Sequence, residues 1–282
     1  MSEPSFPGLD PDIGAYYARA PEESRLGAGP SRLEELRTRE LILRFAPPPP
    51  ATVLDIGGGA GPYAFWLAER GYAVRLIDVA PRLVAIACLR NAREARPLVS
   101  CTVADARALP ERNDSADAVL LLGPLYHLVE SLDRHRALTE AARVLRGGGT
   151  LIAAGISRWA STLDGLSREL LTDQDFARIV EGDLLDGRHR NPTGRLDYFT
   201  TAYFHRPEDL RREVAGAGFE AEGPFGVEGP GWILPDFVNR WNDERRREVL
   251  VGVARMLESE PAMVGASAHL IAVGRKPRRG NY

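Results

Sequence analysis

Three glycines at alternate positions follow a carboxylate in the stretch Thr52–Phe65, which reads TVLDIGGGAGPYAF. Asp55 stands two residues before Gly57, and Gly59 and Gly61 complete the series. Glycine permits positive φ and lets the backbone approach a ligand without a Cβ between them. The free N–H groups at the start of the following helix favour an anionic or polar group. The stretch therefore predicts a ligand-binding turn between a strand and a helix.

The spacing of these glycines differs from that of a dinucleotide-binding turn, whose third glycine stands three residues after the second. Counted from Gly59, that position is Pro62, and counted from Ala60 it is Tyr63. Two alternatives to a specific cofactor stay open at this point. The turn could serve another nucleotide, or it could be a tight connection with no ligand.

Two further acids stand at the ends of predicted strands. Asp78 ends the strand predicted for residues 72–78, and Asp105 follows the strand predicted for 99–103. Ligands of open parallel sheets bind at the carboxyl ends of the strands, so we expect both acids beside the glycine turn. A carboxylate accepts hydrogen bonds from two donors at once.

These features together resemble the class I S-adenosylmethionine-dependent methyltransferases over roughly residues 50–156. The matching positions are DxGxGxG from Asp55, an acid 17 residues after Gly61 (78 − 61), Asp105 between two alanines, and the segment RVLRGGGTL at 143–151. The resemblance implies S-adenosyl-L-methionine as cofactor and S-adenosyl-L-homocysteine as product.

The resemblance also implies a role for each matching position. Asp78 would bind the ribose hydroxyls, Asp105 the adenine amino group, and backbone carbonyls at Leu122 the ammonium of the cofactor. Arg37 stands 20 residues before Gly57 (57 − 37), where several family members have an arginine that reaches the methionine carboxylate; a solvated arginine is the alternative. The residues expected to bind the cofactor are Tyr17, Arg37, Asp55, Gly57, Gly59, Gly61, Asp78, Asp105, Ala106 and Leu122.

His127 is the candidate general base, because it follows the fourth strand and its ordinary pKa of ~6.5 suits proton transfer. The alternative is a histidine that bonds to the backbone and shapes the loop. An aromatic-rich segment at 158–206 would supply walls for a small, partly apolar acceptor, or form a second core. The residues expected at the acceptor are Tyr126, His127, Trp159, Tyr198, Tyr203 and His205.

Residues 123–126 read GPLY and occupy the place of the Asn/Asp-Pro-Pro-Tyr motif in enzymes that methylate exocyclic amines of nucleic-acid bases. The required Asn or Asp is Gly123 here, and one proline is missing. This departure speaks against methylation of nucleic-acid bases.

The elements that position these residues alternate between strand and helix, which predicts an α/β fold with a doubly wound, mostly parallel sheet of seven strands. Residues 1–46 are expected to form a helical arm, in which Ser31 and Glu34 have the spacing of a capping box. Residues 47–282 would form the methyltransferase domain, with a lid insert at about 157–206 that has no obvious strand and a helical insert at about 229–264. The strands are predicted at 53–56, 72–78, 99–103, 116–122, 150–156, 219–227 and 268–275.

Composition restricts the class of partner. The chain has 282 residues and a net charge of −3, which argues against nucleic acid because phosphate binding requires an excess of Lys and Arg. No apolar run approaches the ~20 residues that span a bilayer, and the N-terminal residues do not read as a secretory signal. We therefore expect a cytoplasmic protein with no membrane partner. The sequence shows no metal-ligand spacing and does not indicate the oligomeric state.

The expected function is transfer of a methyl group from S-adenosylmethionine to an O, N or C nucleophile of a small molecule by in-line displacement. Two other functions stay open. A nicotinamide-dependent oxidoreductase would also require Asp78, although it would not require Asp55 or Asp105. A non-catalytic module that binds the cofactor or a partner could share the fold.

Overall fold

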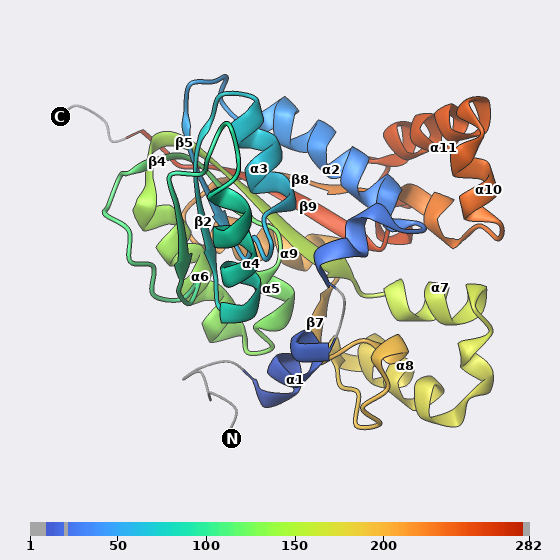
Figure 1. The fold of residues 1–282 in the computed structure, drawn as a ribbon. Coiled ribbons are helices and arrows are strands. Elements are labelled where there is room, and N and C mark those ends of the chain that lie inside the picture. The colour runs from blue at the N-terminus through green and yellow to red at the C-terminus, as the bar shows by residue number, and fades with distance from the viewer. Residues whose placement is uncertain (1–9, 20–21, 279–282) are drawn as a thin grey trace.

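The computed structural model describes residues 10–19 and 22–278, and a central sheet organises them (Figure 1). Seven strands follow one another in the order β3-β2-β1-β4-β5-β9-β8. Only β9 runs against its neighbours, so the sheet is mostly parallel. The bounds of the seven strands are β1 Thr52–Ile56, β2 Ala73–Asp78, β3 Ser100–Val103, β4 Ala116–Leu121, β5 Leu145–Ser157, β8 Glu220–Gly226 and β9 His269–Arg275.

Alternate residues of the inner strands face two apolar clusters, as side chains of a strand must. Val53 and Leu120 belong to the cluster under α2, α3 and α4, whereas Leu54 and Val119 belong to the cluster under α6 and α9. Helices thus cover both faces, which confirms the predicted doubly wound architecture. The bounds of these helices are α2 Ser31–Phe45, α3 Pro62–Glu69, α4 Pro81–Asn91, α6 Ser131–Val144 and α9 Pro207–Gly216.

The expectation that residues 157–206 contain no strand is wrong. β7 (Ala202–His205) pairs in parallel with the end of β5, and the short β6 (Arg188–His189) pairs with β7. Strands of two and four residues show too few alternations to give a period-2 signal. The rest of the insert is helical, with α7 Ala160–Ser167, the 3₁₀ turns η2 Leu170–Thr172 and η3 Leu196–Tyr198, and α8 Gln174–Asp186.

The insert near the C-terminus packs against the arm. Leu33, near the N-terminal end of α2, lies in one apolar cluster with Phe237, Trp241 and Leu250. Figure 1 shows α10 and α11 beside that end of α2. This insert consists of η4 Gly229–Ile233, α10 Phe237–Asn242, α11 Glu244–Leu257 and η5 Val264–Ala266. The division of the chain at residue 46 stays a prediction.

The start of α2 corrects the predicted capping box. Pro30 occupies the N-cap position and no side chain caps the helix. Ser31 and Glu34 instead accept hydrogen bonds from Arg25, which lies on the turn η1 (Glu22–Gly27). A guanidinium offers a carboxylate two charge-assisted hydrogen bonds. Glu34, which the capping box requires, is therefore bound to Arg25 instead.

Two short helices complete the wall of the sheet's carboxyl edge. They are α1 (Pro11–Arg19) from the arm and α5 (Pro124–His127), which directly follows β4. In the part of the chain that the structure describes, no helix has the length and apolarity that a bilayer crossing requires.

Candidate functional site

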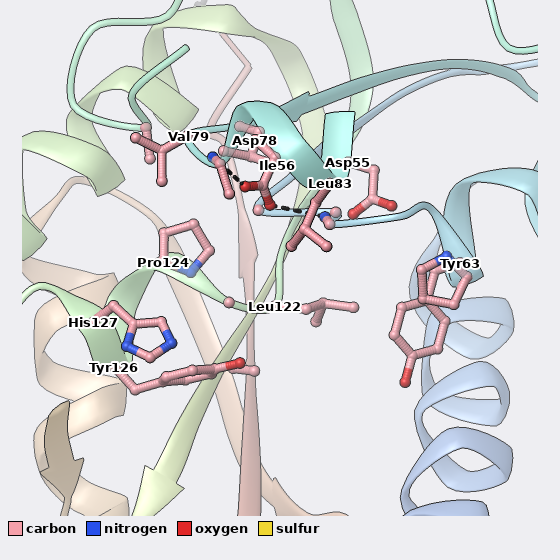
Figure 2. A pocket seen from close by; sticks show the side chains of 18 of the residues that line it. Asp55, Ile56, Tyr63, Asp78, Val79, Leu83, Leu122, Pro124, Tyr126 and His127 are labelled. Carbon is pink, nitrogen blue, oxygen red and sulfur yellow. Dashed lines mark hydrogen bonds between the residues drawn. The ribbon is translucent and has the colours of Figure 1, made fainter. Parts of the chain in front are cut away.

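One cavity of about 310 Å³ lies at the carboxyl ends of β1, β2 and β4. Its lining includes the glycine turn, the acids at the strand ends, α5 and residues of α1 and α2. Figure 2 shows Asp55 and Asp78 on one side of the space, Tyr126 and His127 on another, and Tyr63 opposite them. The structure thus brings together these predicted site residues: Tyr17, Asp55, Gly57, Gly59, Asp78, Asp105, Ala106, Leu122, Tyr126 and His127.

The glycine turn binds directly to the end of β2. Gly57, Gly59 and Gly61 all have positive φ, which only glycine adopts without cost. The N–H of Gly57 donates to the carbonyl of Ile77 at 2.7 Å, and the N–H of Gly59 donates to Asp78 Oδ2 at 2.8 Å. Gly61 does not line the cavity, so its contribution is the shape of the turn.

Asp78 is held from both sides at the rim of the cavity. Its Oδ1 accepts from the N–H of Ala80 at 2.8 Å, while Oδ2 accepts from Gly59. Figure 2 marks both bonds. Each oxygen of a carboxylate has a second lone pair, so this orientation leaves capacity for a pair of ligand hydroxyls.

Asp55 is buried at the base of the turn, 1% exposed. Neither of its oxygens has a hydrogen-bond partner within 3.5 Å among the described residues. Burial, together with the negative charge of Asp78, raises the pKa of Asp55 to about 7. Only the backbone N–H of Ala64 opposes this rise in the pKa of Asp55. A buried carboxylate with so little support at a cavity is the environment that a ligand with positive charge would stabilise, and the ammonium and sulfonium of S-adenosylmethionine fit this requirement.

Replacing Asp55 by asparagine should stabilise the ligand-free protein. The pKa of Asp55 is higher in the folded than in the unfolded chain, so ionisation costs stability progressively as the pH rises from about 4 to about 7, and the full cost is present above that range. Urea denaturation at pH 8 should therefore show a gain of about 1–3 kcal/mol for Asp55→Asn. The same comparison at pH 5 should show a smaller gain, and an equal gain at both values would contradict the raised pKa.

Asp105 reaches the cavity with its carboxylate already bound. Arg107 donates to both of its oxygens at 2.6–3.1 Å, and Arg107 also donates to Asp133. Burial raises the pKa of Asp105, but the hydrogen bonds from Arg107 outweigh it and the net shift is downward. An anionic Asp105 retains lone pairs for a donor such as an exocyclic amine, and its role there stays a prediction.

His127 has partners on both ring nitrogens. The hydroxyl of Tyr17 lies 2.6 Å from Nε2, and the carbonyl of Thr201 lies 3.4 Å from Nδ1. Burial lowers the pKa of His127 to about 4, so the ring is neutral and Nε2 accepts from Tyr17. This environment favours the alternative reading, in which His127 fixes the arm and the loop rather than acting as a base.

Arg37 does not reach the cavity, and the expectation that it binds the cofactor is wrong. Its fully buried guanidinium donates to Glu40 and Glu258 and to the carbonyl of Val227 at 3.4 Å. Glu258 directly follows α11, and Glu40 also pairs with Arg255 of that helix. The cavity is lined instead by Glu34 and Thr38, one turn apart on α2.

Four of the expected acceptor residues also lie away from the cavity. Tyr198 packs against Phe176, with ring centroids 4.8 Å apart, and its hydroxyl donates to Asp173 at 2.7 Å. Trp159 packs against Gly265, near a second surface hollow. The insert therefore forms cores of its own, which was the alternative interpretation.

The other two of these four residues, Tyr203 and His205, lie on β7 and contact the ion pair between Arg134 of α6 and Glu213 of α9. The Arg134 guanidinium lies 3.7 Å from the centroid of the Tyr203 ring. His205 Nε2 lies 3.3 Å from Glu213, and the histidine is fully buried. Neither residue is placed to touch an acceptor.

A charged group that no sequence pattern indicates lies at the opposite end of the cavity. His269 Nδ1 lies 2.6 Å from Glu228 Oε1, and Glu34 stands 3.9 Å from the same nitrogen. Arg25 donates to both oxygens of Glu34, at 2.6 and 3.0 Å. Burial lowers the pKa of His269, but Glu34 and Glu228 overcome this effect and raise it to about 8. No fixed sequence spacing links these residues, and only the position of His269 at the start of the final strand could have indicated them.

The ligand atoms of Glu34, Glu228 and His269 lie within 4.8 Å of one another. Arg25 already neutralises Glu34, and His269 Nδ1 is engaged with Glu228. We therefore interpret the group as an ion-paired network.

Comparison with known proteins gives consistent matches. Residues 54–153 match the family model described as a methyltransferase domain. The chain is 32% identical over 190 residues to demethylmenaquinone methyltransferase of Thermus thermophilus, a match that covers 65% of this chain and 79% of that protein. It is 34% identical over 128 residues to the ubiquinone/menaquinone biosynthesis C-methyltransferase of Acidiphilium cryptum, where the match covers 45% of this chain and only half of the relative.

A solved structure shows the same fold. The crystal structure of an S-adenosylmethionine-dependent methyltransferase from Methanosarcina mazei superimposes with a TM-score of 0.56 at 17% identity. The match covers 85% of this chain and 98% of the other.

Proposed function

Because this chain belongs to the class I S-adenosylmethionine-dependent methyltransferases, we propose that it transfers the methyl group of that cofactor to a small-molecule acceptor. The family provides the cofactor, S-adenosyl-L-methionine, and the product, S-adenosyl-L-homocysteine. The comparisons do not favour an NAD(P)-dependent oxidoreductase. The class of acceptor, in contrast, is inferred from the residues that line the cavity of this chain.

The continuity of the cavity carries the proposal. The same space that borders Asp55, Asp78 and Asp105 continues past Leu122 to Tyr126, and to Ile271 and His269 on β9. A module that only bound the cofactor would not require this extension. An acceptor in the extension would lie beside the glycine turn, and its apolar walls suit a small, partly apolar molecule.

The residues of the site are suited to positioning. When bound, S-adenosylmethionine supplies a methyl group on a positively charged sulfur, so the leaving group is already activated. Asp78, held by two backbone amides, orients the ribose, and the negative charge of Asp55 offsets the positive charge of the cofactor. Holding two reactants in a reactive orientation lowers a barrier by up to ~7–11 kcal/mol, and this is the main contribution that the cavity offers.

Calorimetry can test the proposal directly. We expect S-adenosylmethionine and S-adenosylhomocysteine to bind with micromolar affinity, and NAD and NADP to give no heat of binding. Incubation with S-adenosylmethionine and hydroxylated aromatic probes should then release S-adenosylhomocysteine. Binding of a nicotinamide cofactor, or cofactor binding without turnover of any acceptor class, would favour one of the two other functions. A cytoplasmic location and the lack of a nucleic-acid partner stay predictions.

A further inference from the structure

The register of the sheet places His269 at the acceptor end of the cavity. Ile56 pairs with Leu121, Leu121 with Ala153, and Ala153 with Ala272. The row one residue further along each parallel strand is therefore Gly57, Leu122, Ala154 and Ile271. β9 runs antiparallel, so His269 lies two residues beyond Ile271 toward the carboxyl edge and on the same face of the sheet.

The strand order gives the distance between the Leu122 end and the Ile271 end of the cavity. Leu122 and Ile271 are two strand spacings apart, roughly 10 Å. Cofactor-binding residues line the side of Leu122, and His269 lies across the apolar floor formed by Ala154 and Ile271. A small aromatic ring fits this interval.

Glu228 orients the imidazole of His269. One carboxylate oxygen accepts from the backbone N–H of His269 at 3.0 Å, and the other accepts from Nδ1–H at 2.6 Å. Glu228 is 2% exposed and therefore cannot exchange these bonds for water easily. His269 Nε2 makes no hydrogen bond to any described residue. The fully buried side-chain atoms without a partner do not include it, so this nitrogen is accessible from the cavity that His269 lines.

We propose that His269, oriented by Glu228, is the general base of this enzyme and that its acceptor carries an ionisable hydroxyl group. This inference rests on the proposed function, and it replaces His127 in the role of base. His127 Nε2 already accepts from Tyr17, whereas Nε2 of His269 is available.

A hydroxyl group is the acceptor that suits Nε2 in both of its protonation states. A neutral imidazole accepts a hydrogen bond from O–H, and a protonated imidazole donates to the same oxygen. An ammonium has donors only, so it cannot pair with the protonated ring. The apolar side chains of Val227 and Ile271, which line the same part of the cavity, suit the ring of a phenol or a hydroquinone.

The reaction step balances with these groups alone. The acceptor oxygen forms a bond to the methyl carbon while the bond between that carbon and sulfur breaks, and the electron pair of the broken bond stays on sulfur. The proton of the hydroxyl moves to Nε2 of His269 and later leaves to water. For a hydroquinone that is methylated on carbon, loss of the same proton activates the ring, the ring carbon bonds to the methyl group as the carbon–sulfur bond breaks, and the hydrogen on that ring carbon then leaves to water as a proton while the oxygen regains one from His269.

The charges that face His269 predict a pH dependence. They are the carboxylates of Glu228 and Glu34 and the guanidinium of Arg25, with the hydroxyl of Tyr63 lining the cavity nearby. The pKa of His269 is about 8, so below that pH the ring is protonated and cannot accept a proton. The rate should therefore rise with pH and level off above about 8.

The binding test uses the protein loaded with S-adenosylhomocysteine and ¹⁵N-labelled at histidine. One imidazole should titrate near pH 8, be missing in His269→Asn, and move to lower pH in Glu228→Gln because a negative charge is lost. Catechol or 1,4-naphthalenediol should shift the Nε2 resonance of that ring. If neither probe shifts it in protein that binds S-adenosylhomocysteine normally, the proposal is overturned.

The kinetic test uses whichever probe accepts a methyl group. His269→Asn should lower kcat about 100-fold or more, the usual contribution of a general base, with cofactor affinity within twofold of wild type. Glu228→Gln should shift the midpoint of the pH profile downward, which a purely structural role would not do. His135→Asn, at an exposed position on α6, is the matched control and should change neither. An unchanged pH profile in both site variants would reject His269 as the base, while loss of cofactor binding in wild type would reject the proposed function instead.

Discussion

Replacing Asp78 by alanine is expected to weaken the binding of S-adenosylmethionine by about 10- to 100-fold. A hydrogen bond to a charged group contributes ~1.5–3 kcal/mol, and the carboxylate is expected to receive such bonds from the ribose. Its Oδ1 and Oδ2 also hold the N–H groups of Ala80 and Gly59. The substitution should therefore remove the expected ligand contact and also release the glycine turn.

Calorimetry with S-adenosylhomocysteine measures this loss without a need for the acceptor. Asp175→Ala is the matched control, because Asp175 is an exposed aspartate on α8 that lies outside the cavity. Asp78→Asn separates the two effects, since its amide oxygen can still accept one backbone bond while the charge is gone. Unchanged affinity in Asp78→Ala would remove Asp78 from the cofactor site.

The architecture could be predicted because the patterns that define it are local. Most strands of the main sheet contain an apolar run next to turn residues, although β8 reads EAEGPFG and β5 extends over 13 residues. Asp55, Asp78 and Asp105 stand at or next to strand ends in the sequence itself. Parallel pairing then brings the three acids to one edge. The structure places all three at the cavity, which agrees with that expectation.

The acceptor end could not be predicted in the same way, because long-range packing decides it. Aromatic residues are dense at 158–206, but density does not say which face a side chain takes. Phe176 and Ile179 of α8 are buried in one apolar cluster with Tyr198. Tyr198 packs there and does not reach the cavity.

The network around His269 joins three separate parts of the chain. Glu34 comes from the arm, Glu228 follows β8, and His269 begins β9. Charged residues that meet only through tertiary packing leave no periodic signal in the sequence. The sequence therefore favours His127 as the base, because that residue follows the fourth strand, whereas in the structure its Nε2 lies 2.6 Å from the hydroxyl of Tyr17.

Replacing Gly57 by alanine should destabilise the protein far more than the same change at Gly59. Both glycines have positive φ, +74° and +56°, so alanine carries a similar backbone cost of ~1–2 kcal/mol at each. The surroundings differ. A Cβ on Gly57 would lie 2.4 Å from Cδ of Pro124, whereas the nearest atom to a Cβ on Gly59 is Leu83 Cδ1 at 3.7 Å.

The clash at Gly57 has no flexible partner to absorb it. Pro124 is a rigid ring at the start of α5, the helix that carries Tyr126 and His127. Overpacking of this kind costs ~1–3 kcal/mol, so we expect a total loss of about 2–5 kcal/mol for Gly57→Ala against about 1–2 kcal/mol for Gly59→Ala. Urea denaturation of the ligand-free variants measures the difference.

The same pair of variants also tests whether a shift of the glycine turn moves α5 and its Tyr126. If Pro124 must move to admit a methyl group at Gly57, then Tyr126 moves with it, and the intrinsic fluorescence of the region and the affinity for an acceptor probe should change in Gly57→Ala. In Gly59→Ala the position of α5 should be preserved. Equal destabilisation by both substitutions would mean that the contact with Pro124 does not constrain the turn, and the requirement for glycine at position 57 would then be conformational only.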